Sequence, residues 1–269
     1  KIDEKTCMGC AICEKRCPFS AIKIINIPEI NDDSIIHRYG KNGFALYGLP
    51  SPRKGSVLGM LGRNGIGKTT AVKILAGQEK LNLGKEKVTN EELKDFFQGQ
   101  ELMTYFQELE GKKVAYKPQN LSSLSKDIKA IDLLKERGKE SQIREFAERL
   151  NVTPVLENKL NELSGGELPR IAIIAASLGE ADIYFYDEPL AYLDIGERLR
   201  VSEFIKGVGE ENIIVVVEHD LLILDYLTDY LSIFFGEQGA FGAVSSPKTS
   251  KEGVNAYLSG FLRDENMRI

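Results

Sequence analysis

The sequence predicts an α/β fold with a mostly parallel sheet, preceded by a small cysteine-rich module. Short apolar segments rich in β-branched or aromatic residues alternate with helical patterns, as strands and crossover helices do in parallel sheets. A glycine-rich turn joins one of these segments to a helical pattern. All four cysteines fall within residues 7–17, which sets that end of the chain apart from the rest.

The composition is that of an ordinary globular protein. The chain has 269 residues, of which 42% are hydrophobic and 28% charged, and its net charge is -5. This balance provides no general basic field for nucleic acid, so any such binding needs a local patch. The most apolar region, residues 213–235, is interrupted by Asp, Glu and His side chains that a membrane span could not bury cheaply. We therefore expect no membrane partner.

The cysteines follow the spacing Cys7-x2-Cys10-x2-Cys13-x3-Cys17-Pro18, which is typical of bacterial ferredoxins. In that pattern three neighbouring thiolates hold one 4Fe-4S cluster and the fourth reaches a second cluster. Structural zinc is the alternative, although zinc sites usually place two cysteine pairs further apart. The spacing predicts a 4Fe-4S cluster bound by these four cysteines, in a reducing compartment, which we take to be the cytoplasm.

The cysteine module, residues 1–27, is expected to be partial. If Cys17 serves a second cluster, the remaining ligands of both clusters have to lie upstream of Lys1. The chain also starts without Met and ends abruptly at Ile269, so we expect a fragment of a longer protein. Residues 28–34, rich in Asn, Asp and Pro, predict a linker, and the α/β unit begins near residue 35.

The α/β unit is predicted from its strands and helices in chain order. The first clear strand, Ser56–Leu61, leads through the glycine-rich turn into a helix over Thr69–Ala76. Amphipathic spacing predicts two short helices that meet at Gly99. Further strands are expected at Val114–Tyr116, Ile183–Tyr186 and Ile213–Val217, and further helices at Ile143–Leu150, Ile171–Leu178 and Val254–Leu262.

The glycine-rich turn fits the phosphate-binding P-loop pattern, because it follows a strand and precedes a helix. Its backbone N–H groups and the helix N-terminus suit phosphate. Lys68 is expected to reach the β- and γ-phosphates, and Thr69 to bind Mg²⁺. The predicted phosphate-binding residues are Gly62, Arg63, Asn64, Gly65, Ile66, Gly67, Lys68, Thr69 and the adjoining Thr70.

Two more segments suit nucleotide hydrolysis. Asp187 and Glu188 end the strand at residues 183–186, where Asp187 suits Mg²⁺ and Glu188 suits the polarisation of an attacking water. Such a pair alone is more often a solvated strand end. A second glycine-rich turn, Ser164, Gly165, Gly166 and Glu167, precedes an apolar helix and offers another anion site. Two sites of this kind in one chain are far more specific than one.

These segments, taken in order, resemble an ABC ATPase. The resemblance covers about residues 35–262. It identifies Gln119 as the Q-loop glutamine, which also contacts Mg²⁺, residues 164–167 as the signature, Asp194 as the end of the D-loop, and His219 as the switch histidine. It implies that the cofactors are Mg²⁺ and ATP or ADP, and that ATP is held between two such domains. Lys68, Glu188 and His219 are then the catalytic residues, and the signature serves the opposite nucleotide.

A narrower resemblance is to the RNase L inhibitor family of ribosome-recycling ATPases. It rests on the cysteine segment CMGCAICEKRCPF, on IIHRYG, YGLPSP and FQGQELMTYF, and on the closing YLSGFLRDENMRI. In that family two 4Fe-4S clusters precede two nucleotide-binding domains. The resemblance implies a missing second domain as partner, the small ribosomal subunit, and a release or rescue factor.

The same resemblance implies further roles and boundaries. Tyr39 and Phe44 are expected to pack against adenine. A helix-loop-helix insert at about residues 90–111 is expected to touch the ribosome. A helical subdomain is placed at about 121–180, and the start of a hinge at 263–269. His37 is taken as structural.

Two positions depart from the family pattern. Pro169 stands where the family usually has Gln, in the first helical turn, where it is expected to push Leu168 away from helical geometry. Leu190 replaces a small Ser in the D-loop and is expected to crowd the contact with the second domain.

Three other functions remain open at this stage. A transporter ATPase subunit shares every nucleotide motif, but the cysteine motif argues against it. A chromosome or DNA-repair ATPase carries long coiled coils, and the sequence shows none. In an ATP-driven electron-transfer protein the cluster would change its redox state during turnover, and ligand spacing does not decide this.

Overall fold

The computed structural model describes residues 13, 16–19, 34–41, 43–109, 111–121, 124 and 127–269. Most of the cysteine module predicted at 1–27 and of the linker predicted at 28–34 lies outside these residues. The same holds for the proposed cluster ligands Cys7 and Cys10.

A nine-stranded sheet forms the centre of the described protein, in the order β1-β2-β8-β7-β3-β6-β5-β4, with β9 paired to β7. The run from β7 through β3, β6 and β5 to β4 is parallel throughout. Antiparallel pairs join β1 to β2 and β7 to both β8 and β9. The strands are β1 Ile35–Arg38, β2 Ala45–Tyr47, β3 Ser56–Gly62, β4 Val114–Lys117, β5 Ile183–Asp187, β6 Ile213–Val217, β7 Tyr230–Glu237, β8 Phe241–Val244 and β9 Lys248–Thr249.

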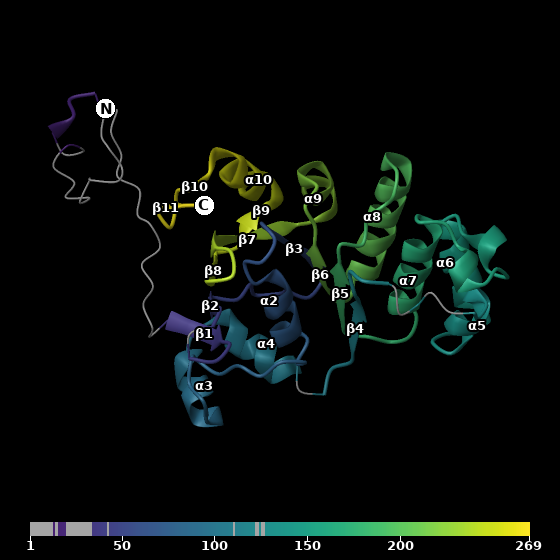
Figure 1. Ribbon diagram of the computed structural model, residues 1–269, viewed down its shortest axis with the longest axis horizontal. Coiled ribbons are helices and arrows are strands. Elements are labelled where there is room, and N and C mark those ends of the chain that lie inside the picture. The colour runs from purple at the N-terminus through teal and green to yellow at the C-terminus, as the bar shows by residue number, and fades with distance from the viewer. Residues whose placement is uncertain are drawn as a thin grey trace.

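Helices cover both faces of this sheet, as Figure 1 shows. One face carries α2, α3 and α4, the other carries α8, α9 and α10, and α5, α6 and α7 gather at the end near β4. A separate hairpin, β10 with β11, lies near α10. The bounds are α2 Lys68–Leu75, α3 Asn90–Phe96, α4 Glu101–Leu109, α5 Ala130–Lys135, α6 Glu140–Arg149, α7 Glu167–Ser177, α8 Ile195–Gly209, α9 Leu221–Leu227, α10 Ser250–Ser259, η3 Thr153–Val155, η4 Leu160–Glu162, β10 Phe261–Leu262 and β11 Met267–Arg268.

The parallel strands are apolar along their length because both faces are buried. Successive side chains point to opposite faces. Leu58 and Phe185 therefore pack in the cluster that contains α2 and α4, whereas Val57 and Tyr186 pack with α7 and α8. The predicted α/β class and its parallel core are confirmed.

The predicted strands agree with β3, β4, β5 and β6 to within about one residue, and Gly99 separates α3 from α4 with φ 79°. The helix expected at Val254–Leu262 is α10, which ends earlier, because Gly260 adopts φ 69° and Phe261 begins β10. The prediction was wrong at that end. Among the described residues no helix is long and apolar enough to cross a bilayer.

Candidate functional site

The glycine-rich turn lies at the carboxyl end of β3 and leads directly into α2. Gly65 and Gly67 adopt φ 74° and 96°, in the region that side chains other than glycine rarely occupy. A Cβ on Gly67 would lie 2.7 Å from Cζ of Phe44 and 3.0 Å from Cδ1 of Leu46. The glycine therefore allows both the turn and the close approach of the β1–β2 hairpin.

Lys68 turns its ammonium back into this loop. Its Nζ donates to the carbonyl oxygens of Gly62 and Arg63, at 2.8 Å in each case, and the residue is buried. Burial lowers the pKa of Lys68 to about 8, against the opposing influence of Glu188 and Asp187. A cation held inside a loop at a helix N-terminus suits an anionic ligand.

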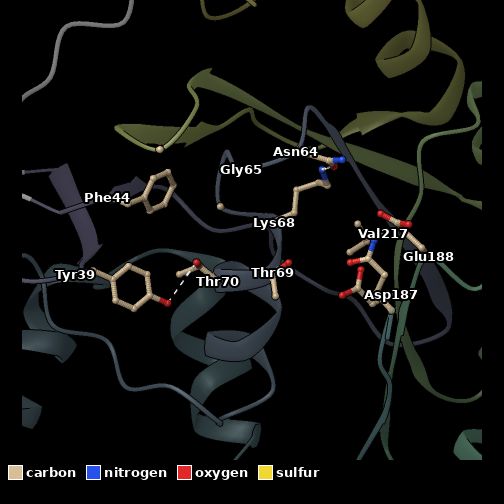
Figure 2. Close-up of a pocket in the computed structure, with 13 residues that line it drawn as sticks. Tyr39, Phe44, Asn64, Gly65, Lys68, Thr69, Thr70, Asp187, Glu188 and Val217 are labelled. Carbon is tan, nitrogen blue, oxygen red and sulfur yellow. Dashed lines mark hydrogen bonds between the residues drawn. The ribbon is translucent and has the colours of Figure 1, made fainter. Parts of the chain in front are cut away.

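A cavity of about 510 Å³ opens at this loop, within the size range of small-molecule sites. It brings together residues from four predicted segments, namely the aromatic pair, the phosphate loop, Gln119 and the acidic pair, although these are far apart in the chain. Tyr39 and Phe44 lie at one end of the cavity in Figure 2, and the carboxylates of Asp187 and Glu188 lie at the other. The lining consists of Tyr39, Phe44, Asn64, Gly65, Gly67, Lys68, Thr69, Thr70, Gln119, Asp187, Glu188, Val217 and Gly239.

Some predicted residues do not line the cavity. Gly62 and Arg63 instead offer the carbonyl oxygens that accept from Lys68, and Ile66 is buried in the core. His219 reaches the site through Glu188, because its Nε2 lies 3.2 Å from Oε1 of that carboxylate. Sequence reasoning missed Val217 and Gly239, for which no motif gives a signal.

The acidic end of the cavity is shaped by burial. Asp187 ends β5, and its Oδ2 accepts a hydrogen bond from the Tyr116 hydroxyl at 3.2 Å. Burial raises the pKa of Asp187, an effect that nearby Glu188 increases. A positive ligand charge beside it would favour the ionised carboxylate.

The donor set fits Mg²⁺. Thr69, Gln119 and Asp187, the three predicted ligands, line the same cavity. In the described part of the chain no cluster of three or more His, Cys, Asp or Glu side chains forms a closed metal cage. Mg²⁺ commonly takes one or two carboxylates together with phosphate oxygens and water, so it does not need such a cage.

The aromatic end of the cavity comes from the β1–β2 hairpin. The Tyr39 hydroxyl donates to Oε2 of Glu79 at 2.7 Å, and the ring is partly exposed. His37 lies buried beside it, with ring centroids 4.7 Å apart and Nε2 3.3 Å from Oε1 of Glu79. Glu79 thus holds both side chains, and His37 occupies the structural position expected of it. The open faces of Tyr39 and Phe44 suit a flat ring.

The second glycine-rich turn does not contribute to this cavity. The Ser164 N–H donates to Oε2 of Glu167 at 2.8 Å, and the Ser164 carbonyl accepts from the Glu167 and Leu168 N–H groups, so the turn is closed onto the start of α7. Those hydrogen bonds with Ser164 lower the pKa of Glu167. Asp194 caps α8 with its side chain, since its Oδ1 accepts from the Glu197 N–H at 2.9 Å. Gly165 and Gly166, in the same turn, are also absent from the lining.

The structure accommodates Pro169 and Leu190, the two residues that depart from the family pattern. Pro169 is the third residue of α7, where a missing N–H leaves no intrahelical bond unmade. Leu168 stays helical and its N–H donates to the Ser164 carbonyl, so the expected distortion was wrong. Leu190 is 2% exposed and packs in the core, so its side chain is turned away from the surface that it was expected to crowd.

Comparison with known proteins adds independent findings. Residues 51–191, just over half of the chain, match the model of the ABC transporter family, and residues 1–23 match that of the 4Fe-4S binding domain. Over its whole length the chain is 47% identical to an uncharacterised ABC transporter ATP-binding protein of Methanocaldococcus jannaschii, and the match covers 45% of that protein. It is also 44% identical to ABC transporter E family member 1 of Arabidopsis thaliana and 41% identical to translation initiation factor RLI1 of Saccharomyces cerevisiae. Each of these matches covers the whole chain and 46% of the relative.

Solved structures give the same picture. The chain aligns over 89% of its length, at TM-score 0.83 and 42% identity, with 47% of a chain from a complex of archaeal ribosomal stalk protein aP1 and archaeal ribosome recycling factor aABCE1. It aligns over its whole length, at TM-score 0.85 and 45% identity, with 46% of a chain from ribosome-bound archaeal Pelota and ABCE1. A transporter cassette at 20% identity and TM-score 0.59, covering 84% of this chain and 93% of its own, shares the fold alone. The chain spans about half the length of the curated relatives it matches.

Proposed function

Because the chain belongs to the ABC ATPase family and, within it, to the RNase L inhibitor group, we propose that it is the nucleotide-binding and hydrolysing part of a cytoplasmic ribosome-recycling ATPase. Residues 35–262 form the ATP-binding domain, and residues 263–269 begin the hinge to a second such domain. Closure of the two domains around ATP drives the separation of ribosomal subunits, and hydrolysis resets the open form.

One observation carries the nucleotide part of the proposal. The phosphate loop, Gln119, Asp187 and Glu188 line a single cavity, while the signature turn at residues 164–167 lies outside it. A signature that does not serve its own cavity is available to a nucleotide bound elsewhere. Each ATP is then completed by the partner domain, with Asp194 in the D-loop between the two.

The residues of the cavity divide the work. Lys68 and the loop N–H groups hold the phosphates, and Thr69, Asp187 and Gln119 hold Mg²⁺, whose charge offsets the negative charge on the transferred phosphoryl group. Glu188 orients the attacking water, and His219 contacts both this carboxylate and the γ-phosphate. Tyr39 and Phe44 hold adenine against their rings.

The ribosome part of the proposal rests on the relatives. One is named as a translation initiation factor, and two structural neighbours were solved with a ribosomal stalk protein and on the ribosome with Pelota. We place the contact with the small ribosomal subunit on the α3–α4 insert, and a release or rescue factor beside the domain. Cys7, Cys10, Cys13 and Cys17 hold a 4Fe-4S cluster, in keeping with the match of residues 1–23 to the 4Fe-4S binding domain.

The test uses a protein in which this domain, carrying Glu188→Gln, is joined to a second nucleotide-binding domain. It is incubated with small ribosomal subunits and either ATP or ADP, and sedimented through a sucrose gradient. We expect sedimentation with the subunit in ATP but not in ADP, because the variant binds ATP without resetting. Lys68→Ala is the control that should sediment alone. Confirmed ATP binding without any association with the subunit would refute the recycling function.

A further inference from the structure

Lys117 is a buried cation beside the site that the roles above leave unused. It is the last residue of β4, it is 2% exposed, and its Nζ donates at 2.9 Å to the carbonyl oxygens of both Asp187 and Glu188. Burying an ammonium is unfavourable unless its donors are satisfied. This lysine is satisfied by the backbone that carries the two carboxylates of the cavity.

The backbone that Lys117 holds is strained. Glu188 adopts φ 44°, in the left-handed region that side chains other than glycine occupy at an energetic cost. Such a conformation persists only where its surroundings enforce it. Lys117 binds the carbonyl oxygens before and after the Glu188 α-carbon, so it favours this turn over an extended continuation of β5.

Glu218 holds the other side of the same turn. It follows β6 and is buried, with Oε1 accepting from the Leu190 N–H and Oε2 from the His219 N–H, both at 3.0 Å. One carboxylate therefore joins the segment after Glu188 to the histidine that contacts Glu188. Burial raises the pKa of Glu218, and these two hydrogen bonds oppose the shift.

We propose that Lys117 and Glu218 form a buried brace that positions Glu188 against His219 for ATP hydrolysis. Both act through backbone groups rather than by touching the nucleotide, so they are positioning residues. This inference rests on the proposed ATPase function of the same cavity. It explains why two charged residues are buried behind the acidic end of the site.

The brace also ties together three segments of the cavity. Lys117 stands two residues before Gln119, and Glu218 stands immediately before His219. The Q-loop and the switch histidine are therefore fixed to the turn at Glu188. A displacement of either segment is transmitted to the carboxylate that orients water.

Lys117→Met keeps the length of the side chain and removes its donors, and Glu218→Gln keeps the shape but loses one acceptor. The control is Lys129→Met, since Lys129 binds Glu157 at 2.9 Å and neither residue lines the cavity. Turnover and Mg-ATP affinity are measured in the protein that joins this domain to a second one.

We expect Lys117→Met and Glu218→Gln to lower kcat by about 10- to 100-fold, because small misplacement of a catalytic group has effects of this size. The dissociation constant for Mg-ATP should stay within about threefold, because the phosphate loop is untouched. The double variant should lose little more than the worse single variant, since both act on one turn. Lys129→Met should keep its kcat, because the ion pair that it loses lies outside the cavity lining.

The two proposals can fail separately. A wild-type protein that neither binds nor hydrolyses Mg-ATP would sink the ATPase function itself. If the wild type turns over and both variants match it, the brace is refuted. If Lys117→Met does not fold, the kcat of Glu218→Gln tests the brace instead, together with a crystal structure of that variant. A Glu188–His219 contact unchanged from 3.2 Å in that crystal would also overturn the inference.

Discussion

Replacing Gly67 with Ala tests how closely the phosphate loop and the aromatic end of the cavity depend on each other. At φ 96° an alanine is strained by about 1–2 kcal/mol. Its Cβ would also lie 2.7 Å from the Phe44 ring, so the ring has to move, and overpacking of this kind adds about 1–3 kcal/mol. The total is about 2–5 kcal/mol of lost unfolding free energy, which corresponds to a fall in Tm of about 5–15 °C.

Gly99→Ala is the matched control. Gly99 has φ 79°, but a Cβ added there would meet nothing within 4 Å, so only the backbone strain applies. Differential scanning calorimetry gives both changes in Tm, and a fluorescent ATP analogue gives the affinities. We expect Gly67→Ala to lose more stability and at least about fivefold in affinity, because the displaced Phe44 ring no longer packs on adenine. Equal losses of stability in the two variants, or unchanged affinity in Gly67→Ala, would refute this reasoning.

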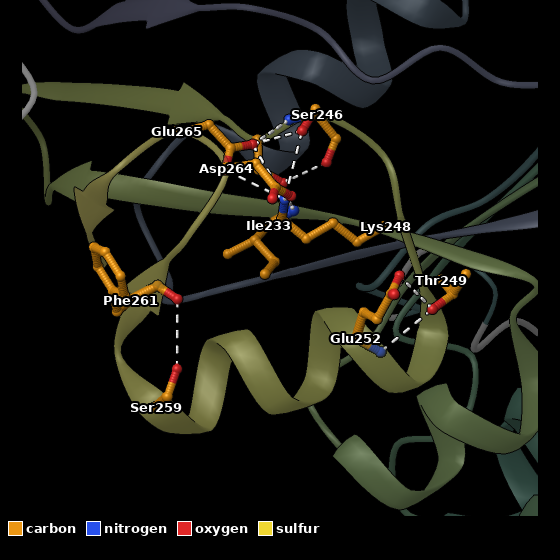
Figure 3. Close-up of polar contacts among 10 residues, drawn as sticks. Ile233, Ser246, Lys248, Thr249, Glu252, Ser259, Phe261, Asp264 and Glu265 are labelled. Atoms are coloured by element: carbon orange, nitrogen blue, oxygen red, sulfur yellow. Dashed lines mark hydrogen bonds and ion pairs between the residues drawn. The ribbon is translucent and has the colours of Figure 1, made fainter.

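Three further predictions concern parts of the domain with separate roles. Tyr39→Ala should weaken ATP binding by about tenfold with little change in Tm, because the ring is partly exposed; calorimetric titration checks this, and equal weakening for inorganic triphosphate would contradict a role at adenine. Lys248→Met should speed amide exchange of the β10–β11 hairpin by roughly 30-fold, because it removes a charged hydrogen-bond donor to Asp264 and Glu265 that is worth about 2 kcal/mol (Figure 3). Unchanged exchange would show that these ion pairs do not hold the hairpin. Tyr105→Phe removes a buried 2.7 Å hydrogen bond to the Leu75 carbonyl that joins α4 to α2, so urea unfolding should show a loss of about 1–2 kcal/mol; no loss would mean that the insert is held by apolar packing alone.

The parallel core was predictable because its information is local. Strands such as Ile183–Asp187 are short and apolar on both faces, and turn residues mark where such strands end. The β7–β8 hairpin was missed, because the glycines around Gly236 indicate only a turn and the pairing of the strands depends on distant neighbours.

The cavity was predictable to a similar extent. Its motifs identify Lys68 and Asp187 from spacing, whereas Val217 and Gly239 line it through the fold alone. The burial of the Leu190 side chain could not be predicted either. A D-loop residue is expected to be exposed, and only the course of the backbone shows that this leucine packs in the core. Lys117 has no motif role, and its importance is visible only where its ammonium meets two carbonyl oxygens.

The central claim is that this domain holds ATP but needs the signature turn of a second domain to hydrolyse it. The most direct test compares the present chain alone with the protein that joins it to a second nucleotide-binding domain, by measuring Mg-ATP affinity and steady-state phosphate release. We predict that the single domain binds Mg-ATP in a manner that depends on Lys68 but releases phosphate at least about tenfold more slowly. Equal rates of release would contradict the claim, because the cavity would then be complete without a partner.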